Sequence, residues 1–267
     1  KLILFQHGIS REISKHCDLI LPFLEGANSD IFITYNKKAK ELYSNENLNS
    51  SKNYDVGVSR DYYPRFYKSD KCPEILYNFT GIYCNQVIAS RGILDSDIAD
   101  LEISILKKIF KKIPHTVLFK TYPNYWNYPG NDPIIETAKK IKNIKIYNKD
   151  VDSRFIMHEF RIIITSRLTS TLGWSIMSGK PVIFLNSDHK YFCRDEVFEL
   201  LKKSIIVFDK RDKNFVNKTK SFLKKSIEEI EDLYSKKSKS REEFIKKYIS
   251  SHKSNAGKKI SEILINI

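Results

Sequence analysis

The segment 162–185 constrains the fold of this chain more than any other part of the sequence. It reads Ile-Ile-Ile-Thr, then a run rich in hydroxyl side chains, then Leu-Gly-Trp-Ser-Ile-Met, a Ser-Gly-Lys-Pro break and the run Val-Ile-Phe-Leu. Two short apolar runs joined by one helix are typical of a β-α-β unit, because parallel strands need a crossover connection. The segment therefore predicts two buried parallel strands with a helix between them.

The turn between the first strand and the helix has the composition of an anion-binding site. It carries Ser166, Arg167, Thr169, Ser170 and Thr171. The free backbone N–H groups and the dipole of a helix start favour a phosphate, and the guanidinium group adds a permanent positive charge. A second interpretation stays open, because serine and threonine are also ordinary helix caps that need no ligand.

The same alternation of strands and helices extends along most of the chain. Apolar runs predict strands at 2–5, 30–34, 54–58, 74–79, 116–120, 144–147, 161–165, 182–185 and 205–208. Patterning and caps predict helices at 37–43, 96–112, 133–141, 152–160 and 195–203 and from 215 onwards, whereas 12–21 is either helix or loop. This alternation predicts an α/β fold with a Rossmann-like, doubly wound parallel sheet. Ligands of such folds bind at the carboxyl ends of the strands.

Composition and missing motifs exclude several classes of protein. The 267 residues are 41% hydrophobic and 29% charged, which is typical of a soluble globular protein. No apolar run approaches the roughly 18–20 residues of a membrane span. The four cysteines (Cys17, Cys72, Cys84 and Cys193) are scattered, which favours free thiols in a reducing cytoplasm. The sequence has no P-loop, no G-x-G-x-x-G, no H-E-x-x-H and no G-x-S-x-G motif, and no acidic cluster that predicts a metal.

The net charge of +14 has two interpretations. Lysine, asparagine and isoleucine are abundant together, as an AT-rich genome would produce. The alternative is an anionic partner: a nucleotide, an acidic polymer or an anionic membrane surface. The lysine-rich tail carries apolar residues at helical spacing, which either dock on the protein or attach weakly to a membrane. No nucleic-acid-binding signature is present, so we predict no specific nucleic-acid partner.

Three further candidates lie at or beyond predicted strand ends. His7, followed by Gly8, is either a base or donor to a ligand, or a histidine hydrogen-bonded at a strand end. Lys120 faces either a phosphate or solvent. Arg194 follows the second strand of the β-α-β unit, where it either faces the same ligand or pairs with Asp195 at the surface.

Four stretches, in order, resemble one known group of enzymes: Gln6-His7-Gly8, Leu118–Pro123, Ser170–Met177 and Gly179–Ile183. They are similar to the GT-B-type transferases of bacterial surface polysaccharides. This group includes capsule and O-antigen (lipopolysaccharide) glycosyltransferases, some of the Kdo type, and the CDP-glycerol glycerophosphotransferases. The resemblance spans nearly the whole chain, and its most specific part is the last two stretches.

The resemblance implies a cytoplasmic, metal-independent transferase, with the chain forming the carboxyl-terminal part of a two-domain enzyme. Residues 1–70 would be the end of an acceptor-side domain and a linker, 71–215 a nucleotide-donor domain, and 216–267 basic helices packing back on both. The enzyme would need no cofactor. Its donor would be a nucleotide-sugar or CDP-polyol, and its acceptor a polysaccharide or a lipid-linked chain. The basic tail leaves peripheral contact with the inner membrane face open as a second possibility.

The resemblance also implies roles for individual residues. His7 would be the catalytic group in the cleft between the domains. Gly8, Lys120, Ser166, Arg167, Thr169, Ser170, Thr171, Ser175 and Arg194 would line the donor and phosphate site. Two positions depart from the pattern of the group: Tyr122 replaces a histidine before proline, and Ser175 replaces a glutamate that commonly holds a donor ribose. A non-catalytic nucleotide- or polyanion-binding module is the alternative function.

Overall fold

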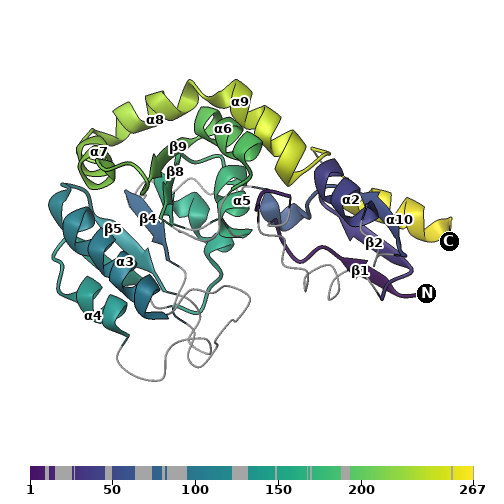
Figure 1. Ribbon diagram of the computed structural model, residues 1–267, viewed down its shortest axis with the longest axis horizontal. Coiled ribbons are helices and arrows are strands. Elements are labelled where there is room, and N and C mark those ends of the chain that lie inside the picture. The colour runs from purple at the N-terminus through teal and green to yellow at the C-terminus, as the bar shows by residue number, and fades with distance from the viewer. Residues whose placement is uncertain are drawn as a thin grey trace.

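Two parallel sheets organise the chain in the computed structural model, which describes residues 1–9, 12–15, 26, 28–45, 50–63, 74–79, 82, 95–121, 132–147, 149–166, 168, 170–187, 193–253 and 255–266. Within these residues, one sheet has the strand order β1-β2-β3 and the other the order β6-β5-β4-β7-β8-β9. Figure 1 shows the six-stranded sheet and its helices on the left and the three-stranded sheet on the right. The predicted α/β fold with parallel sheets is confirmed.

The six-stranded sheet is doubly wound. Its strands are β4 (Ile75–Asn78), β5 (Val117–Lys120), β6 (Ile144–Tyr147), β7 (Ile162–Thr165), β8 (Val182–Asn186) and β9 (Ile206–Asp209), and every neighbouring pair is parallel. The chain starts at the central strand β4, moves outwards to β6, and returns to the other side of β4 through β7. The direction of winding therefore reverses between β4 and β7, which is where such folds bind their ligands.

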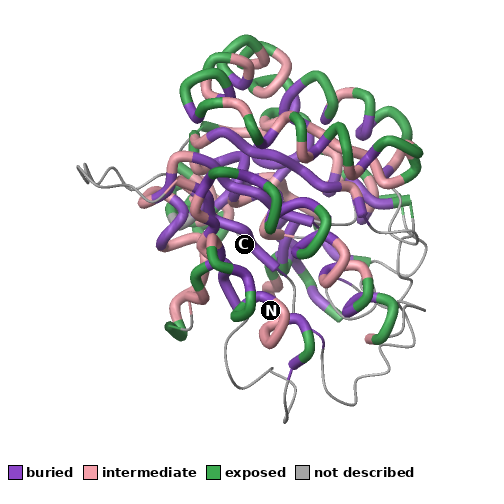
Figure 2. The backbone as a smooth tube through the Cα atoms, turned by 90° about the vertical axis from the view of Figure 1, so that its left-hand side faces the viewer, coloured by how far each residue is buried: buried purple, intermediate pink, exposed green. Residues whose placement is uncertain are grey.

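Helices on both sides of this sheet bury its apolar faces. They are α3 (Asp95–Lys108), α4 (Pro133–Lys139), α5 (Ser170–Met177), α6 (Asp195–Ser204) and α7 (Phe215–Phe222). The inner strands β4, β5, β7 and β8 are buried on both faces, as Figure 2 shows in purple. This burial explains why the strands appear in the sequence as continuous apolar runs rather than as alternating patterns.

The smaller sheet consists of β1 (Ile3–Phe5), β2 (Ile31–Thr34) and β3 (Lys52–Asp55). Alternate side chains of β2 point to opposite faces. Phe32 packs on Tyr43 of α2 (Lys37–Ser44), with ring centroids 4.4 Å apart. Ile31 and Ile33 instead pack against the last helix, α10 (Ala256–Ile265). Two helices far apart in the sequence thus cover the two faces of this sheet.

The carboxyl-terminal helices link the two sheets. α8 (Ile227–Ser235), α9 (Ser238–Phe244) and a π-helical turn (Ile245–Ile249) run back from the six-stranded sheet towards the three-stranded one (Figure 1). The apolar side chains of this stretch belong to the main core: Ile227, Ile230, Phe244, Tyr248 and Ile249. They therefore contact the protein itself, so they do not form an exposed apolar face for a membrane.

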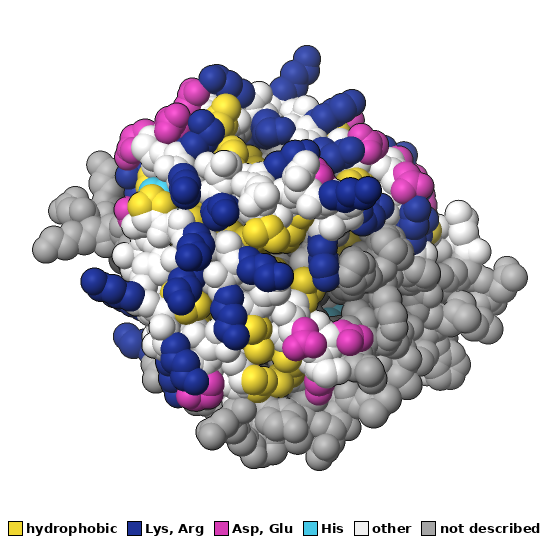
Figure 3. Space-filling view, turned by 60° about the vertical axis from the view of Figure 1, so that its left-hand side comes forward, with side chains coloured by type: hydrophobic (Ala, Val, Ile, Leu, Met, Phe, Trp, Pro, Cys, Tyr) yellow, Lys and Arg dark blue, Asp and Glu magenta, His cyan; other side chains and the backbone are white. Residues whose placement is uncertain are grey.

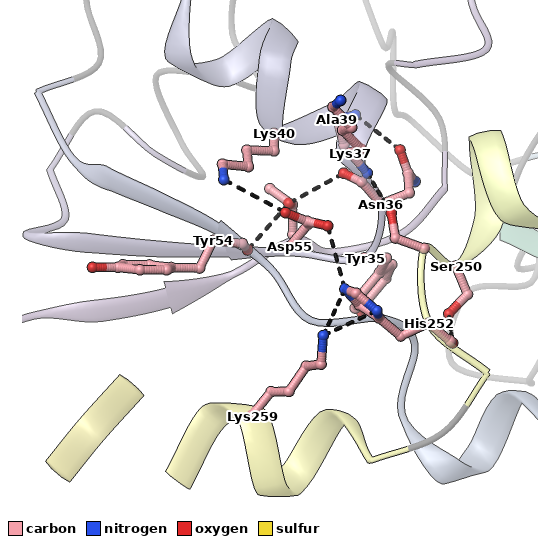
Figure 4. Close-up of polar contacts among 12 residues, drawn as sticks. Tyr35, Asn36, Lys37, Ala39, Lys40, Tyr54, Asp55, Ser250, His252 and Lys259 are labelled. Atoms are coloured by element: carbon pink, nitrogen blue, oxygen red, sulfur yellow. Dashed lines mark hydrogen bonds and ion pairs between the residues drawn. The ribbon is translucent and has the colours of Figure 1, made fainter. Parts of the chain in front are cut away.

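Ser250 to His252 form a clasp between the π-helical turn and α10 (Figure 4). The Ser250 hydroxyl accepts a hydrogen bond from the Val58 N–H at 3.0 Å, and the Ser251 hydroxyl accepts one from the Lys37 N–H at 2.6 Å. The His252 ring lies 3.4 Å from the Asp55 carboxylate and 2.8 Å from the Lys259 ammonium group. The clasp thus joins the end of β3 to the first turn of α10.

Two secondary-structure predictions differ from the structure. The strand predicted at 54–58 is β3, Lys52–Asp55, because its register is fixed by pairing Ile31 with Lys52 and Thr34 with Asp55. The helix predicted at 152–160 consists of two 3₁₀ turns, Ser153–Phe155 and Met157–Glu159. The tighter turns place Ile156, Met157 and Phe160 together on one face of the sheet, a packing arrangement that local sequence preference does not encode.

The surface carries a broad basic face. Figure 3 shows lysine and arginine side chains spread over the face that includes the left side of Figure 1, with few acidic groups among them. Exposed lysines on α3, α4, β6 and the adjoining turns are Lys107, Lys108, Lys111, Lys112, Lys139, Lys140, Lys142 and Lys145. Among the described helices, none combines the length and the apolar character that a membrane span requires.

Candidate functional site

A row of polar side chains crosses the carboxyl edge of the six-stranded sheet at the reversal of winding. Asn78 ends β4 and lies in register with Lys120 of β5 on one side and with Thr165 of β7 on the other. Residues in register on neighbouring strands point to the same face. All three side chains are buried. The row lies on the face of the sheet that carries Leu76 and Ile163.

Asn78 is the unusual member of this row. The residue is only 5% exposed, and neither its Oδ1 nor its Nδ2 has a hydrogen-bond partner among the described residues. Buried amides are almost always paired, and an unpaired one costs about 1–3 kcal/mol. Asn78 lies at the place where doubly wound sheets bind ligands, which makes it a candidate ligand contact.

The Lys120 ammonium group is held close to the sheet. Its Nζ donates to the carbonyls of Thr121 at 2.7 Å and Lys149 at 3.2 Å, which takes up two of its three donors. Burial lowers the pKa of Lys120, while the negative charges of Asp150 and Asp152 act in the opposite direction. A phosphate bound beside Lys120 would likewise favour the charged form.

The Ser166 hydroxyl is buried and hydrogen-bonded inside the protein. It donates to the Glu102 carboxylate of α3 at 2.8 Å, and that carboxylate also accepts from the Tyr77 hydroxyl. The Ser166 carbonyl accepts from the Ser187 hydroxyl at 3.0 Å. Both Ser166 and Glu102 are buried. These contacts hold Ser166 in place directly after β7.

Gly8 brings the smaller sheet against the start of α5. A Cβ atom placed on Gly8 would lie 2.2 Å from the Ser170 Oγ, so only glycine fits without a shift. One turn along the helix, a Cβ on Gly173 would lie 2.4 Å from Ile9 Cδ1. Two glycines, one from each partner, therefore allow the turn after β1 to pack on α5. His7 precedes this contact and is exposed.

A second set of contacts holds the stretch 12–15 against the start of α6. The Arg194 N–H, at the start of α6, donates to the Ile13 carbonyl at 2.9 Å. Ser14 forms an isolated antiparallel bridge with Cys193, and Lys15 pairs with Asp195 at 2.8 Å. The stretch 12–15 is therefore fastened to the start of α6, in the same way that Gly8 is fastened to the start of α5.

A row of edge-to-face aromatic contacts continues this boundary between the two sheets. Tyr35 follows β2, Tyr62 lies in a 3₁₀ turn after β3, and Trp174 lies on α5, with ring centroids 5.6 and 6.0 Å apart in succession. The Arg154 guanidinium group lies 5.2 Å from the Trp174 ring centroid. Burial raises the pKa of Tyr62, so its hydroxyl is neutral at physiological pH.

The structure thus brings together some of the predicted site residues and separates others. Gly8 meets Ser170 at the start of α5, with His7 and Thr171 next to them in the sequence, while Lys120 lies two strands from β7 on the same edge. The Ser175 hydroxyl is fully buried and donates to the Thr171 carbonyl at 2.7 Å. Arg167 and Thr169 lie outside the described residues. Within the described part of the chain, no group of three or more His, Cys, Asp or Glu side chains gathers as a metal site would require.

Solved structures share this arrangement at low sequence identity. HepE from Anabaena, in complex with UDP and glucose, aligns with a TM-score of 0.54 and 11% identity over 99% of this chain and 71% of its own. MurG from Acinetobacter baumannii aligns with a TM-score of 0.52 and 10% identity over 99% of this chain and 66% of its own. The chain has a GT-B-like fold.

This chain spans only part of the length of these proteins. TarM aligns with a TM-score of 0.51 and 12% identity over 98% of this chain but 49% of its own. No protein-family model matches the sequence, and no curated protein is significantly similar to it. The likeness therefore establishes the GT-B glycosyltransferase fold, while the resemblance to capsule, Kdo-type or CDP-glycerol enzymes stays a prediction.

Sequence reasoning missed three buried polar residues of this GT-B-like fold: Glu12, Asn78 and Glu102. One signal was available for Glu102, which lies four residues after Ile98 and three before Ile105, on the apolar side of a predicted helix. A carboxylate at such a position must have a partner. Asn78 carries the same kind of signal, because it stands between Tyr77 and Phe79 in an apolar run predicted as a strand. Glu12 carries none, because its burial depends on segments distant in the sequence.

Proposed function

We propose that this chain is part of a glycosyltransferase that moves a sugar from a nucleotide-activated donor to an acceptor. The observation that carries the proposal is the contact of Gly8 with Ser170, which brings the exposed His7 to the start of α5 at the carboxyl edge of the sheet. The GT-B-like fold supports it, and so does HepE, whose structures contain UDP, glucose or UDP-glucose.

The donor phosphate would bind at the start of α5. Ser170 and Thr171 open this helix, and Arg167 and Thr169 precede it in the sequence. Free N–H groups of the helix start and the Lys120 ammonium group would stabilise the negative charge that develops on the departing nucleotide. The Asn78 amide, which has no partner in the described part of the chain, would form its hydrogen bonds with the donor.

The proposal gives the residues of the two sheets different roles. His7, from the smaller sheet, would act on the acceptor hydroxyl as a base or an orienting group. Charge stabilisation would come from the helix start and Lys120, so the reaction is proposed as metal-independent. We leave Ser166 and Ser175 out of the donor contacts, because their hydroxyls donate to Glu102 and to the Thr171 carbonyl.

The finer part of the proposal concerns the acceptor. The four stretches that resemble surface-polysaccharide transferases support a growing capsule or lipopolysaccharide chain, or a lipid-linked precursor, as acceptor, and a CDP-polyol as an alternative donor. The basic face in Figure 3 supports weak contact with an anionic membrane surface. On this proposal the enzyme would work in the bacterial cytoplasm, at the inner membrane face.

Two variants test the donor site and the catalytic group separately. Ser170→Ala/Thr171→Ala should weaken UDP or CDP binding about tenfold in calorimetry, because charge-assisted hydrogen bonds are lost. His7→Ala should leave nucleotide binding unchanged and lower turnover of nucleotide-sugars about 100-fold. Ser235→Ala, an exposed hydroxyl on α8, is the matched control.

The same measurements separate the proposal from its alternative. Saturable nucleotide binding without turnover of any UDP-, CMP- or CDP-linked donor, and without an effect of His7→Ala, would indicate a non-catalytic binding module. Binding that follows salt concentration alone, with no preference for one nucleotide, would indicate a general polyanion surface. Turnover that persists in a chelator supports the metal-independent form of the reaction.

A further inference from the structure

A fully buried carboxylate lies behind the turn that carries His7. Glu12 is 0% exposed, and its Oε1 accepts hydrogen bonds from the Asn36 Nδ2 at 2.8 Å and the Gln6 Nε2 at 3.2 Å. Burying a carboxylate is costly unless hydrogen bonds compensate it. Each amide is also hydrogen-bonded to backbone groups, and these bonds hold its nitrogen next to Glu12.

The Gln6 side chain joins the end of β1 to the His7-Gly8 turn. Its Oε1 accepts from the Tyr35 N–H at 2.9 Å, and its Nε2 donates to the Gly8 carbonyl at 2.8 Å as well as to Glu12. Gln6 is 3% exposed. The position of Gly8 against Ser170 therefore depends on which end of this amide faces the turn.

The Asn36 side chain joins the same carboxylate to two other segments. Its Oδ1 accepts from the Ala39 N–H at 2.8 Å and so caps α2, as the dashed line in Figure 4 shows. Its Nδ2 donates to the Tyr248 carbonyl of the π-helical turn at 3.0 Å and to Glu12. One carboxylate thus lies between the first turn, α2 and the carboxyl-terminal helices.

A carboxylate reinforces the orientation of these amides. An amide has a donor end and an acceptor end, whereas an ionised carboxylate only accepts. The Gly8 and Tyr248 carbonyls accept from the two nitrogens, the Tyr35 and Ala39 N–H groups donate to the two oxygens, and Glu12 favours the same arrangement. A neutral amide at position 12 would place its own N–H group where Oε2 now accepts from the Gln6 Nε2 at 3.4 Å, so two donors would face each other.

We propose that Glu12 is a positioning residue: its buried carboxylate accepts from both the Gln6 and Asn36 amides and reinforces their orientation, and through Gln6 it holds the His7-Gly8 turn against the start of α5. The inference rests on the proposed function, because the turn matters for catalysis only if His7 does. Glu12 itself is buried and does not touch the substrate.

Hydrogen exchange tests the orientation directly, whether or not the chain is a transferase. In Glu12→Gln, the backbone amides of Tyr35 and Ala39 should exchange about tenfold faster, because a donor at position 12 opposes the Gln6 and Asn36 nitrogens and their oxygens are held less firmly. The amides of Ile31 to Ile33 should keep their protection. Lys15→Ala is the control. Lys15 lies three residues after Glu12, and the change removes its exposed ion pair with Asp195, so none of these rates should change.

Kinetics tests the consequence for His7. Glu12→Gln should lower kcat about 10- to 100-fold and leave the donor KM within about twofold, because misplacement of a catalytic group affects the chemical step. In a His7→Ala background, Glu12→Gln should have no further effect on kcat. A purely structural role would give the same loss in both backgrounds.

The outcomes separate the two proposals. Faster exchange at Tyr35 and Ala39 together with a non-additive kcat loss supports the inference. Unchanged exchange at these two amides, or equal acceleration throughout β2, overturns it. If no donor is turned over by the unmodified protein, the proposed function fails, and the exchange rates still decide whether Glu12 orients the amides.

Discussion

The carboxyl edges of the two sheets differ in how their polar side chains are satisfied. At the three-stranded sheet, the side chains of Gln6, Glu12 and Asn36 bond to one another and to backbone groups. At the six-stranded sheet, the Asn78 amide has no partner among the described residues. A satisfied network holds its parts rigid, whereas an unsatisfied amide leaves hydrogen-bonding capacity for something else.

This difference gives the two sheets separate roles in the proposed function. The smaller sheet holds the His7-Gly8 turn in place, and the larger sheet carries the Asn78 amide to which we propose that a ligand binds. The two are joined where Gly8 meets Ser170 and where Ile13 meets Arg194. Each prediction below tests one side of this comparison or the joint between them.

The largest expected effect concerns Cys193, at the joint. Burial raises the pKa of the Cys193 thiol from 9.0 to about 12, with the charges of Glu196 and Asp195 acting in the same direction. Its thiolate fraction near pH 8 should therefore be roughly 1000-fold below that of an ordinary thiol. We expect alkylation of the Cys193 peptide, followed by mass spectrometry, to be slow in the folded protein and fast in urea.

The same shift has a sign that can be checked. The unfolded thiol ionises first, so the folded state binds more protons between pH 9 and about 12, and stability falls as pH rises through that window. Cys193→Ala should remove this part of the pH dependence. Rapid alkylation of native Cys193 would mean that 12–15 is not held against α6.

The next effect concerns the contact of Gly8 with Ser170. Gly8→Ala should lower the free energy of unfolding by about 2 kcal/mol, because the added methyl group overlaps the Ser170 Oγ. Ser170→Ala removes that oxygen, so the double variant should recover most of the loss in urea titrations. Equal losses in the single and double variants would contradict the contact.

A smaller effect, with opposite signs for stability and binding, is expected at Asn78. Asn78→Leu should stabilise the ligand-free protein by about 1 kcal/mol, because an unpaired buried amide is removed, and should weaken nucleotide binding about fivefold. Asn143→Leu is the matched control: its Nδ2 donates to the carbonyls of Phe110, Ile113 and His115, so this change should destabilise the protein. Loss of stability in Asn78→Leu would show that the amide is satisfied.

The smallest effect is expected at the clasp. Asp55→Asn weakens ion pairs with Lys40 at 3.6 Å and His252 at 3.4 Å, and should cost about 0.5 kcal/mol at low salt. The cost should shrink further near about 1 M salt, where charges are screened. Asp232→Asn, whose partner Lys236 lies on the same helix, is the control for a local pair.

Much of the fold was predictable because apolar runs encode burial locally. β4, β5, β7 and β8 are buried on both faces, so their positions appear as uninterrupted apolar runs. Strand β3 was displaced by two residues in the prediction, because Lys52 and Asn53 are polar and enter the strand only through pairing with β2. Helix ends were predictable where caps such as Asp132 exist.

The candidate site was only partly predictable. Ser170 and Thr171 follow from their place after a strand, since helix starts at the carboxyl edge of a sheet face the ligand side. Ser166 directly follows the same strand and Ser175 lies further along the same helix, yet their hydroxyls bond inside the protein. Which way a hydroxyl points depends on acceptors that local sequence does not specify.

The sequence by itself determined the order of strands and helices, the parallel sheets that this order requires, and the edge at which a ligand would bind. Only the tertiary structure decided which polar groups at that edge are satisfied. Glu12 finds its partners at Gln6 and Asn36, and Asn36 in turn reaches Tyr248 at the far end of the chain. Hydrogen bonds between such distant residues form only after the apolar runs have packed, because packing is what brings them within reach.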